Sequence, residues 1–99
     1  MNLKGKIYYS KASFLPTTML EASFKLAKKQ GKDLNKLRNI TEKLVNDEQI
    51  PAVNLDHSLK GRWIPYRELH IEPDWLLIYR KFENSIRFER LGSHTDLFG

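Results

Sequence analysis

Three histidines and one aspartate are the residues of this 99-residue chain whose types and positions suggest chemistry. His57 lies in the segment DHSLKG, His70 and Asp74 lie in HIEPDW, and His94 lies in the closing SHTDLFG. Histidine titrates near neutral pH, so one imidazole can take up a proton in one step and release it in another. Asp74 can orient an imidazole, stabilise its charged form or accept a proton. We therefore expect an acid–base site in the C-terminal half.

Two reaction classes use such residues. Zinc hydrolysis needs three histidines, or two and a carboxylate, as ligands. The histidines are thirteen and then twenty-four residues apart, which matches no compact zinc motif, and the chain has no cysteine, so we predict no metal and no other cofactor. Metal-free RNA cleavage needs a base at the ribose 2′-hydroxyl, an acid at the leaving 5′-oxygen and cations at the phosphate. Histidines, an aspartate and arginines supply all three, which favours this class.

Aromatic and basic side chains near the histidines are candidates for substrate binding. An exposed Trp75 or Phe98 ring could stack on an RNA base, which contributes about 1–3 kcal/mol per base. For Trp75, which begins a predicted strand, the alternative is burial in the core. Four arginines could lie along the open side of the predicted sheet: Arg67, Arg80, Arg87 and Arg90. Of these, Arg67 and Arg90 are the candidates for substrate binding.

The elements that must position these residues belong to an α+β fold. Residues 5–10, GKIYYS, are typical of an N-terminal strand, and Pro16 in the following loop suits the first turn of a helix. Apolar spacing predicts a helix over residues 17–30 that ends at Gly31, and a second helix that Asp33 caps. Because only GKD joins the two helices, we expect them to pack as an antiparallel hairpin.

The second half of the chain has the pattern of an antiparallel meander. IPAVNLDHSLKG predicts a loop, and RWIPYRELHI, WLLIYRKF and SIRFERLG predict three strands with turns at EPD and ENS. In the middle strand, Leu76 and Ile78 should face one side and Leu77 and Tyr79 the other. We expect the helices to cover one side of the sheet and a short tail or helix to close the chain. Residues 1–99 should form a single domain.

The excess positive charge of the chain lies in its first half. The net charge is +5, and residues 1–50 hold ten Lys/Arg against five Asp/Glu, whereas residues 51–99 hold seven of each. A basic surface attracts polyanions without specifying a sequence, so we expect RNA contact there. No apolar run is long enough for a membrane span or a secretion signal, and we expect a cytoplasmic protein. The lysines that cluster around the helical turn are Lys25, Lys28, Lys29, Lys32 and Lys36.

The C-terminal segments, taken together, resemble a known family. Residues 56–99, with DHSLKG, YRELHIEPDWLLIY and RFERLGSHTDLFG, resemble the YafQ-type branch of the RelE/ParE toxin superfamily, and AKKQGKDLNKL is also similar. These are the toxins of bacterial type II toxin–antitoxin pairs. The resemblance implies a microbial-RNase-like fold and a ribosome-dependent mRNA endonuclease that needs no metal. Such enzymes leave a 2′,3′-cyclic phosphate and a 5′-hydroxyl.

The resemblance also implies residue roles and partners. His94 and Asp74 would be the acid–base partners, and His57 and His70 would assist at the phosphate. Trp75 and Phe98 would position the base or the cleaved nucleotide. The lysine cluster would contact ribosomal RNA. The partners would be the ribosome, mRNA and a cognate DinJ/RelB-like antitoxin, with a heterotetrameric complex and a monomeric free toxin.

The sequence departs from the family pattern at two places, and two alternative functions are also compatible with it. Ser58 stands where the family usually has proline, and residues 10–25 lack the lysine-rich start common to the first helix. Neither change removes a candidate catalytic group. One alternative is a ParE-like toxin that inhibits gyrase without catalysis, although such toxins do not need this histidine set. The other is a catalytically inactive relative that only binds the antitoxin.

Overall fold

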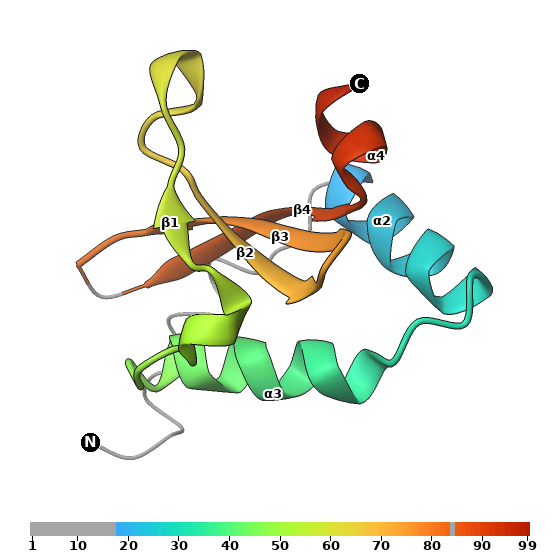
Figure 1. Ribbon diagram of the computed structural model, residues 1–99, viewed down its shortest axis with the longest axis horizontal. Helices are drawn as coiled ribbons and strands as arrows, with labels where there is room; N and C mark the ends of the chain where they lie inside the picture. The colour runs from blue at the N-terminus through green and yellow to red at the C-terminus, as the bar shows by residue number, and fades with distance from the viewer. Residues whose placement is uncertain (1–17, 84) are drawn as a thin grey trace.

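A computed structural model describes residues 18–83 and 85–99, in which two helices precede a four-stranded sheet and a short C-terminal helix (Figure 1). The strands lie in the order β1-β2-β3-β4, and each neighbouring pair is antiparallel. The α+β class is therefore confirmed, whereas the predicted strand at residues 5–10 and Pro16 lie outside the described residues. The elements are α2 (Thr18–Lys29), α3 (Leu34–Val45), η1 (Ala52–Asn54), β1 (His57–Ser58), η2 (Gly61–Trp63), β2 (Arg67–Glu72), β3 (Trp75–Lys81), β4 (Ile86–Gly92) and α4 (His94–Phe98).

The ends of the two long helices follow the predicted signals. Gly31 has φ +73°, a left-handed conformation that glycine adopts without steric cost, and the Lys32 N–H donates back to the Ala27 carbonyl at 3.0 Å. The Asp33 side chain then accepts a hydrogen bond of 3.0 Å from the Asn35 N–H and caps α3. Both predicted boundary residues are confirmed.

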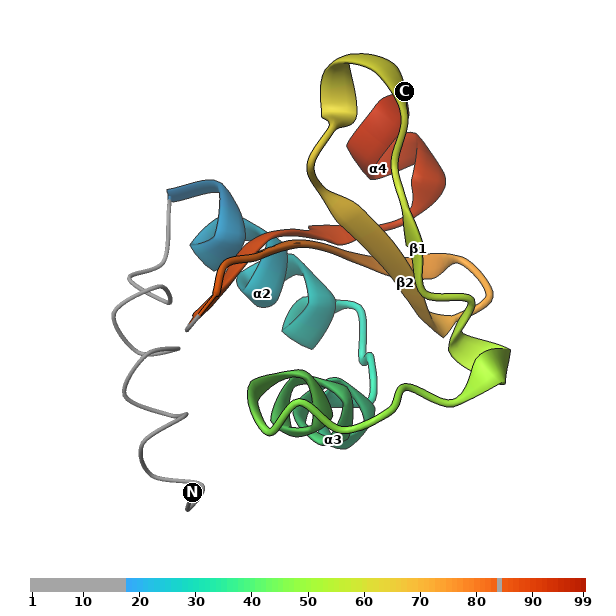
Figure 2. The same ribbon diagram turned by 90° about the vertical axis from the view of Figure 1, so that its left-hand side faces the viewer.

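The packing of α2 and α3 differs from the prediction. α2 packs mainly against β4, while α3 lies beneath β2. Figure 2 shows α3 nearly end-on with α2 running obliquely to it, so the two do not lie side by side as an antiparallel hairpin. The reason is that each helix directs its apolar residues at the sheet. Leu37, Ile40 and Leu44 of α3 join the same buried cluster as Leu77 and Tyr79 of β3.

The two faces of β3 separate two clusters of buried side chains, as the alternation predicted. Leu77 and Tyr79 face α2 and α3 in the larger cluster. Leu76 and Ile78 face the opposite side and pack with Leu97 of α4 in the smaller one. Figure 2 shows α4 and the η2 turn on the side of the sheet away from α3. No helix within 18–83 and 85–99 is long and apolar enough to cross a membrane.

The first strand of the sheet was not predicted. His57 and Ser58 lie in a segment expected to be a loop, yet His57 pairs with Glu68 and Ser58 with Arg67. β2 itself begins at Arg67, five residues after the predicted start. Residues 61–63 form a 3-10 turn instead, and Pro65 has no N–H for sheet pairing. The short β1 pairing places His57 beside β2.

Candidate active site

The three histidines form a row on the face of the sheet away from α3. The His57 and His70 ring centroids are 6.3 Å apart, and those of His70 and His94 are 5.7 Å apart. His57 comes from β1, His70 from β2 and His94 from the first position of α4. The structure therefore brings together all three side chains that the sequence singled out.

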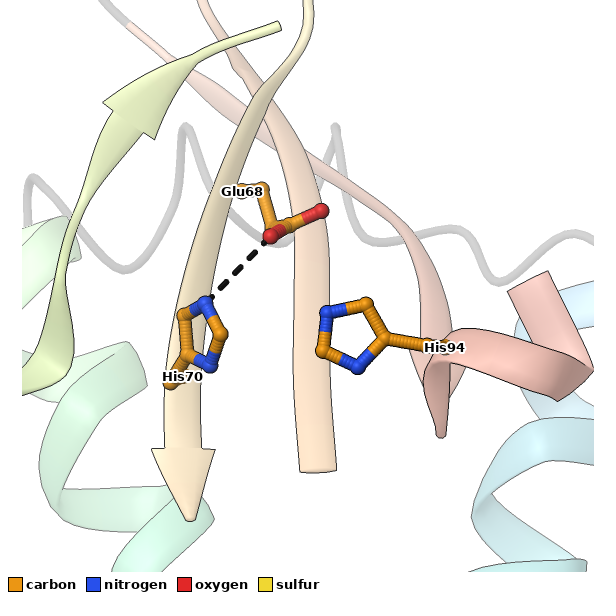
Figure 3. Close-up of side chains that lie close together, drawn as sticks. All are labelled: Glu68, His70 and His94. Carbon is orange, nitrogen blue, oxygen red and sulfur yellow. Dashed lines mark ion pairs between the residues drawn. The ribbon is translucent and has the colours of Figure 1, made fainter. Parts of the chain in front are cut away.

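Glu68 is a member of this site that the sequence reasoning missed. It lies two residues before His70 on β2 and therefore on the same face of the strand, and it is only 6% exposed. Its Oε1 is 3.4 Å from His70 Nε2 and 3.7 Å from His57 Nε2. Figure 3 shows Glu68, His70 and His94 pointing toward one another. The i, i+2 spacing of a carboxylate and an imidazole in RELHIE was the available signal.

The Nδ1 atom of each histidine contacts an oxygen atom that can accept a hydrogen bond. Because a carbonyl or carboxylate oxygen can only accept, the hydrogen of each neutral ring is assigned to Nδ1, which donates. The Nε2 atoms then carry the lone pairs. The Nδ1 contacts are His57 to the Leu55 carbonyl at 2.6 Å, His70 to the Pro73 carbonyl at 3.1 Å and His94 to Asp74 Oδ1 at 2.7 Å.

Asp74 holds His94 through two hydrogen bonds. Its Oδ1 accepts from the His94 backbone N–H at 3.0 Å and contacts His94 Nδ1 at 2.7 Å. The backbone hydrogen bond first, and the side-chain bond second, hold the pKa of Asp74 below its ordinary value. Asp74 is therefore a carboxylate at neutral pH. In that state it can orient His94 and stabilise an imidazolium, but it has no proton to donate.

The start of α4 places His94 in the row. Ser93 Oγ accepts from the Asp96 N–H at 3.1 Å, and Asp96 Oδ2 accepts from the Ser93 N–H at 3.1 Å, which forms a capping box. Gly92 permits the close approach, because a Cβ there would lie 3.0 Å from the Asp96 Cβ and 3.2 Å from its Oδ2. The sequence LGSHTD thus sets where His94 stands.

Trp75 does not have the exposure that base stacking requires. Its side chain is only 2% exposed and belongs to the larger core cluster with Leu77 and Tyr79. The alternation of β3 turns it toward the helices, and Lys32 Nζ lies 5.8 Å from its ring centroid. The structure corrects the expectation that this ring contacts RNA and supports the structural alternative.

Arg67 is also directed away from the histidine row. It precedes Glu68 on β2 and so faces the other side of the sheet. Its Nε is 3.3 Å from both Asp56 Oδ1 and the Tyr79 hydroxyl, and Nη1 donates to Ser58 Oγ at 2.8 Å. Burial raises the pKa of Tyr79, and its hydroxyl donates to Asp56. Arg67 thus secures β1 against the sheet and is corrected from a substrate-binding candidate to a positioning residue.

Arg90 and Phe98 line a cavity of about 280 Å³ beside the row, together with Trp63, Tyr66, Ile78, Glu89 and Leu97. Phe98 is 41% exposed, and its ring meets Trp63 edge-on at a centroid distance of 5.5 Å. Arg90 donates to the carbonyls of Leu97 and Asp96 at 3.3 and 3.1 Å. Trp63, which lies in the predicted strand segment RWIPYRELHI, is the aromatic partner that the sequence reasoning missed.

The lysine cluster surrounds the α2–α3 turn as predicted, and four of its five side chains are exposed. Lys32 is partly buried, and its Nζ lies 3.8 Å from Glu72 Oε1. Lys36 Nζ lies 3.1 Å from Glu72 Oε2. Two lysines are therefore partly neutralised by the end of β2, and the exposed positive charge is concentrated on Lys25, Lys28 and Lys29.

The chain is similar to known proteins over most of its length. The family model described as bacterial toxin of type II toxin–antitoxin system, YafQ, matches residues 12–99. The mRNA interferase toxin YafQ of Escherichia coli strain K12 is 50% identical over 76 residues, which cover 76% of this chain and 83% of that protein.

Solved structures show the same fold. The E. coli DinJ–YafQ toxin–antitoxin complex contains a chain with a TM-score of 0.79 and 45% identity, and the match covers 84% of this chain and 92% of that one. A metal-bound toxin from Helicobacter pylori has a TM-score of 0.77 and 34% identity, with coverage of 83% and 93%. Because these two chains are 45% and 34% identical to this one, they are similar to it in sequence as well as in fold.

Proposed function

Because the chain belongs to the YafQ family of bacterial type II toxins, we propose that it is an endoribonuclease toxin that cuts mRNA during translation. The observation that carries this proposal is the row of His57, His70 and His94. Glu68 contacts His70 in this row, and Asp74 contacts His94. RNA cleavage without a metal requires proton transfer at two oxygens, and this row supplies adjacent imidazoles.

Two of the imidazoles are proposed to carry the protons. His70 Nε2 accepts the proton of the 2′-hydroxyl while its Nδ1 remains bound to the Pro73 carbonyl. The 2′-oxygen attacks phosphorus, the bond from phosphorus to the 5′-oxygen breaks, and His94 Nε2 donates a proton to that oxygen. Asp74 stabilises the charged form of His94 beforehand, and Glu68 stabilises that of His70 afterwards. The products are a 2′,3′-cyclic phosphate and a 5′-hydroxyl.

His57 and Arg90 flank these two groups in the proposed mechanism. A protonated His57, held by Glu68 and the Leu55 carbonyl, adds positive charge at one end of the row. Arg90 lines the cavity that also contains Trp63 and Phe98. Cations placed where the phosphoryl oxygens gain charge stabilise the transition state.

The aromatic cavity is proposed to hold a nucleobase next to the cleaved bond. Its walls include the partly exposed Phe98 and Trp63 rings, and Glu89 and Arg90 supply polar groups at its edge. Stacking on such a ring contributes about 1–3 kcal/mol per base and tolerates different bases. In this proposal Phe98 has the role expected from the sequence, and Trp63 is its partner in place of the buried Trp75.

The partners are proposed from the family and from the charge of the molecule. Lys25, Lys28 and Lys29 would contact ribosomal RNA in the cytoplasm, and the toxin would be monomeric when free. A DinJ/RelB-like antitoxin would bind the toxin, as DinJ binds YafQ in the E. coli complex. The complex would be a heterotetramer.

Primer extension on ribosome-bound mRNA tests the proposed activity. Wild type should cut within codons only when ribosomes are present, and His94→Ala should lower single-turnover cleavage by about 10²- to 10⁴-fold, because one proton-transfer group is removed. Binding of the antitoxin serves as the folding control and should be unchanged.

Two results would contradict the proposal. Equal toxicity of the wild type and His94→Ala would indicate a non-catalytic relative that acts through binding. Breaks in DNA without mRNA cuts would indicate a gyrase inhibitor.

A further inference from the structure

We propose that Glu89 makes the aromatic cavity selective for guanine, so that the toxin prefers mRNA with a guanine on the 3′ side of the cut. Glu89 lines the cavity together with the Trp63 and Phe98 rings. A carboxylate therefore lies next to the rings on which a base would stack. The preference in cleavage rests on the proposed function, whereas the binding of guanine in the cavity can be measured without cleavage.

A β-bulge in β4 places Glu89 in the wall of the cavity. The register pairs Phe88 with Tyr79 and then Arg90 with Ile78, so Glu89 is an extra residue between two neighbouring pairs. Phe88 belongs to the larger core cluster on one face of the sheet, whereas Glu89 and Arg90 both line the cavity on the other face. In a regular strand, one of two consecutive side chains would face the core.

The two charged residues of the bulge have different contacts. Arg90 donates from Nη1 to the Leu97 carbonyl at 3.3 Å and from Nη2 to the Asp96 carbonyl at 3.1 Å. Both carbonyls belong to α4, so Arg90 secures the helix that carries Phe98. Glu89 makes no such contact with α4 within the described residues and is the acceptor that the bulge offers to a base.

The Glu89 carboxylate is oriented by two neighbours and keeps acceptor sites for a ligand. Arg87 Nε donates to Oε1 at 2.8 Å, and the Tyr66 hydroxyl donates to the same oxygen over a longer 3.4 Å. Within residues 18–83 and 85–99 both bonds fall on Oε1, while an ionised carboxylate has about four acceptor sites. The Glu89 side chain is 22% exposed, and partial shielding from water strengthens a hydrogen bond to a ligand.

Guanine is the base whose Watson–Crick edge fits a group that only accepts hydrogen bonds. Its N1–H and N2–H donors lie side by side, and a carboxylate can accept from both. Adenine and cytosine present one donor beside a ring-nitrogen lone pair, and uracil presents one donor between two carbonyl oxygens. These three bases bring a lone pair against the carboxylate, which is unfavourable in a partly buried site.

The aromatic rings supply stacking, and the carboxylate supplies the choice of base. Trp63 of η2 and Phe98 of α4 meet edge-on, with an angle of 90° between the ring planes, and Figure 2 shows η2 and α4 on the same side of the sheet. A base can stack on the face of one ring. Every base has such a face, so stacking alone selects none of them.

The position of the cavity assigns the selected base to the 3′ side of the cut. Leu97 and Phe98 line the cavity and belong to α4, which begins at His94. His94 is the residue proposed to protonate the leaving 5′-oxygen. That oxygen belongs to the nucleotide downstream of the broken bond, so the base in the cavity is on this downstream side.

NMR titration of the full-length toxin with GMP, AMP, CMP and UMP tests the cavity without any cleavage. The indole N–H resonance of Trp63 should shift, while that of Trp75, which is 2% exposed, serves as the internal reference. GMP should bind about 5- to 150-fold more tightly than the other three nucleotides, the usual discrimination by one bidentate contact to a base.

Glu89→Gln is the decisive variant. Its amide presents one acceptor beside one donor, which suits adenine, so the preference for GMP should disappear and AMP should bind at least as tightly. Glu48→Gln is the matched control, because it makes the same change at an exposed carboxylate that pairs with Lys43 outside the cavity. It should keep the preference for GMP.

The preference in cleavage is tested with ribosome-bound mRNA that carries randomised codons. Wild-type cuts should be enriched in guanine at one position on the 3′ side, and Glu89→Gln should lose this enrichment. Phe98→Leu should slow cleavage about 5- to 150-fold for all four bases and keep the preference, since it removes only stacking.

Equal affinity of wild type for the four nucleotides would overturn the inference, and this measurement needs no variant that has to fold. A preference for GMP that survives in Glu89→Gln would overturn the role of Glu89. Cuts that require ribosomes but show no guanine preference would disprove selection in cleavage and leave the proposed function intact. Selective binding of GMP without any cleavage of mRNA would count against the proposed function and support the cavity.

Discussion

Asp74 and His94 show how one hydrogen-bonded pair sets the chemistry of a site. Asp74 accepts two hydrogen bonds from His94, one from the backbone and one from the ring. Those bonds favour the charged carboxylate, so the pKa of Asp74 lies below its ordinary value. Asp74 thereby fixes the His94 tautomer and leaves Nε2 as the only ring nitrogen free to exchange protons with a substrate.

The pH dependence of stability should reveal this pair. A carboxylate with a lowered folded-state pKa stabilises the protein above its unfolded pKa, near 3.8, and this contribution is lost as pH falls through the folded-state value. Asp74→Asn removes the charge. Urea unfolding from pH 3 to 6 should therefore show wild type more stable than Asp74→Asn at pH 5 to 6, with the difference shrinking toward pH 3. A difference that grows on acidification would contradict the charged pair.

The short helix α4 is the element on which His94 depends. It spans His94–Phe98, and its capping box joins Ser93 to Asp96. A helix of five residues gains little from its own hydrogen bonds, so its cap and its contacts with the sheet decide whether it forms. Leu97 supplies the main contact, packing with Leu76 and Ile78.

Removal of this cap should lower both stability and activity. Ser93→Ala should destabilise the protein by about 0.5–2 kcal/mol, the usual cost of removing an N-cap side chain, and should lower single-turnover cleavage by displacing His94. Asp33→Ala is the matched control, since Asp33 caps α3, away from the site. It should destabilise the protein similarly and leave cleavage at saturating ribosome concentration unchanged. An equal decrease of cleavage in both variants would contradict a special role for α4.

At the scale of the whole molecule, the lysine cluster extends from the α2–α3 turn to the edge of the site, where Lys32 and Asp74 line one pocket. Replacing Lys25, Lys28 and Lys29 with glutamine should weaken ribosome binding, and the log–log slope of affinity against salt should fall by about 0.7–0.9 for each phosphate that the toxin no longer neutralises. The control replaces three lysines outside the cluster: Lys43, Lys60 and Lys81. Filter binding at several salt concentrations measures the affinity for the ribosome and its dependence on salt for both triple variants. Equal weakening by the two triple variants would indicate a response to net charge alone.

Patterns of local sequence predicted the elements and the chemical residues well. Gly31 and Asp33 mark the helix ends because a positive φ and an N-cap are local requirements. The two faces of β3 follow from alternation. Glu68 and β1 were missed because their importance comes from the pairing of two segments whose partner residues lie nine and eleven positions apart in the chain. Trp75 was misjudged because side-chain burial depends on which face the helices cover.

The amino-acid sequence by itself determined which reactive groups the protein has: three imidazoles and the Asp74 carboxylate, but no thiol. It also determined that the first half is basic. It also determined the helix boundaries and strand alternation, because those depend on neighbouring residues. Only the tertiary structure decided which groups meet. Strand pairing brought His57 and Glu68 together, and the β4–α4 junction brought His94 to Asp74. Distances between side chains that are far apart in the chain depend on packing and register, which local spacing does not encode.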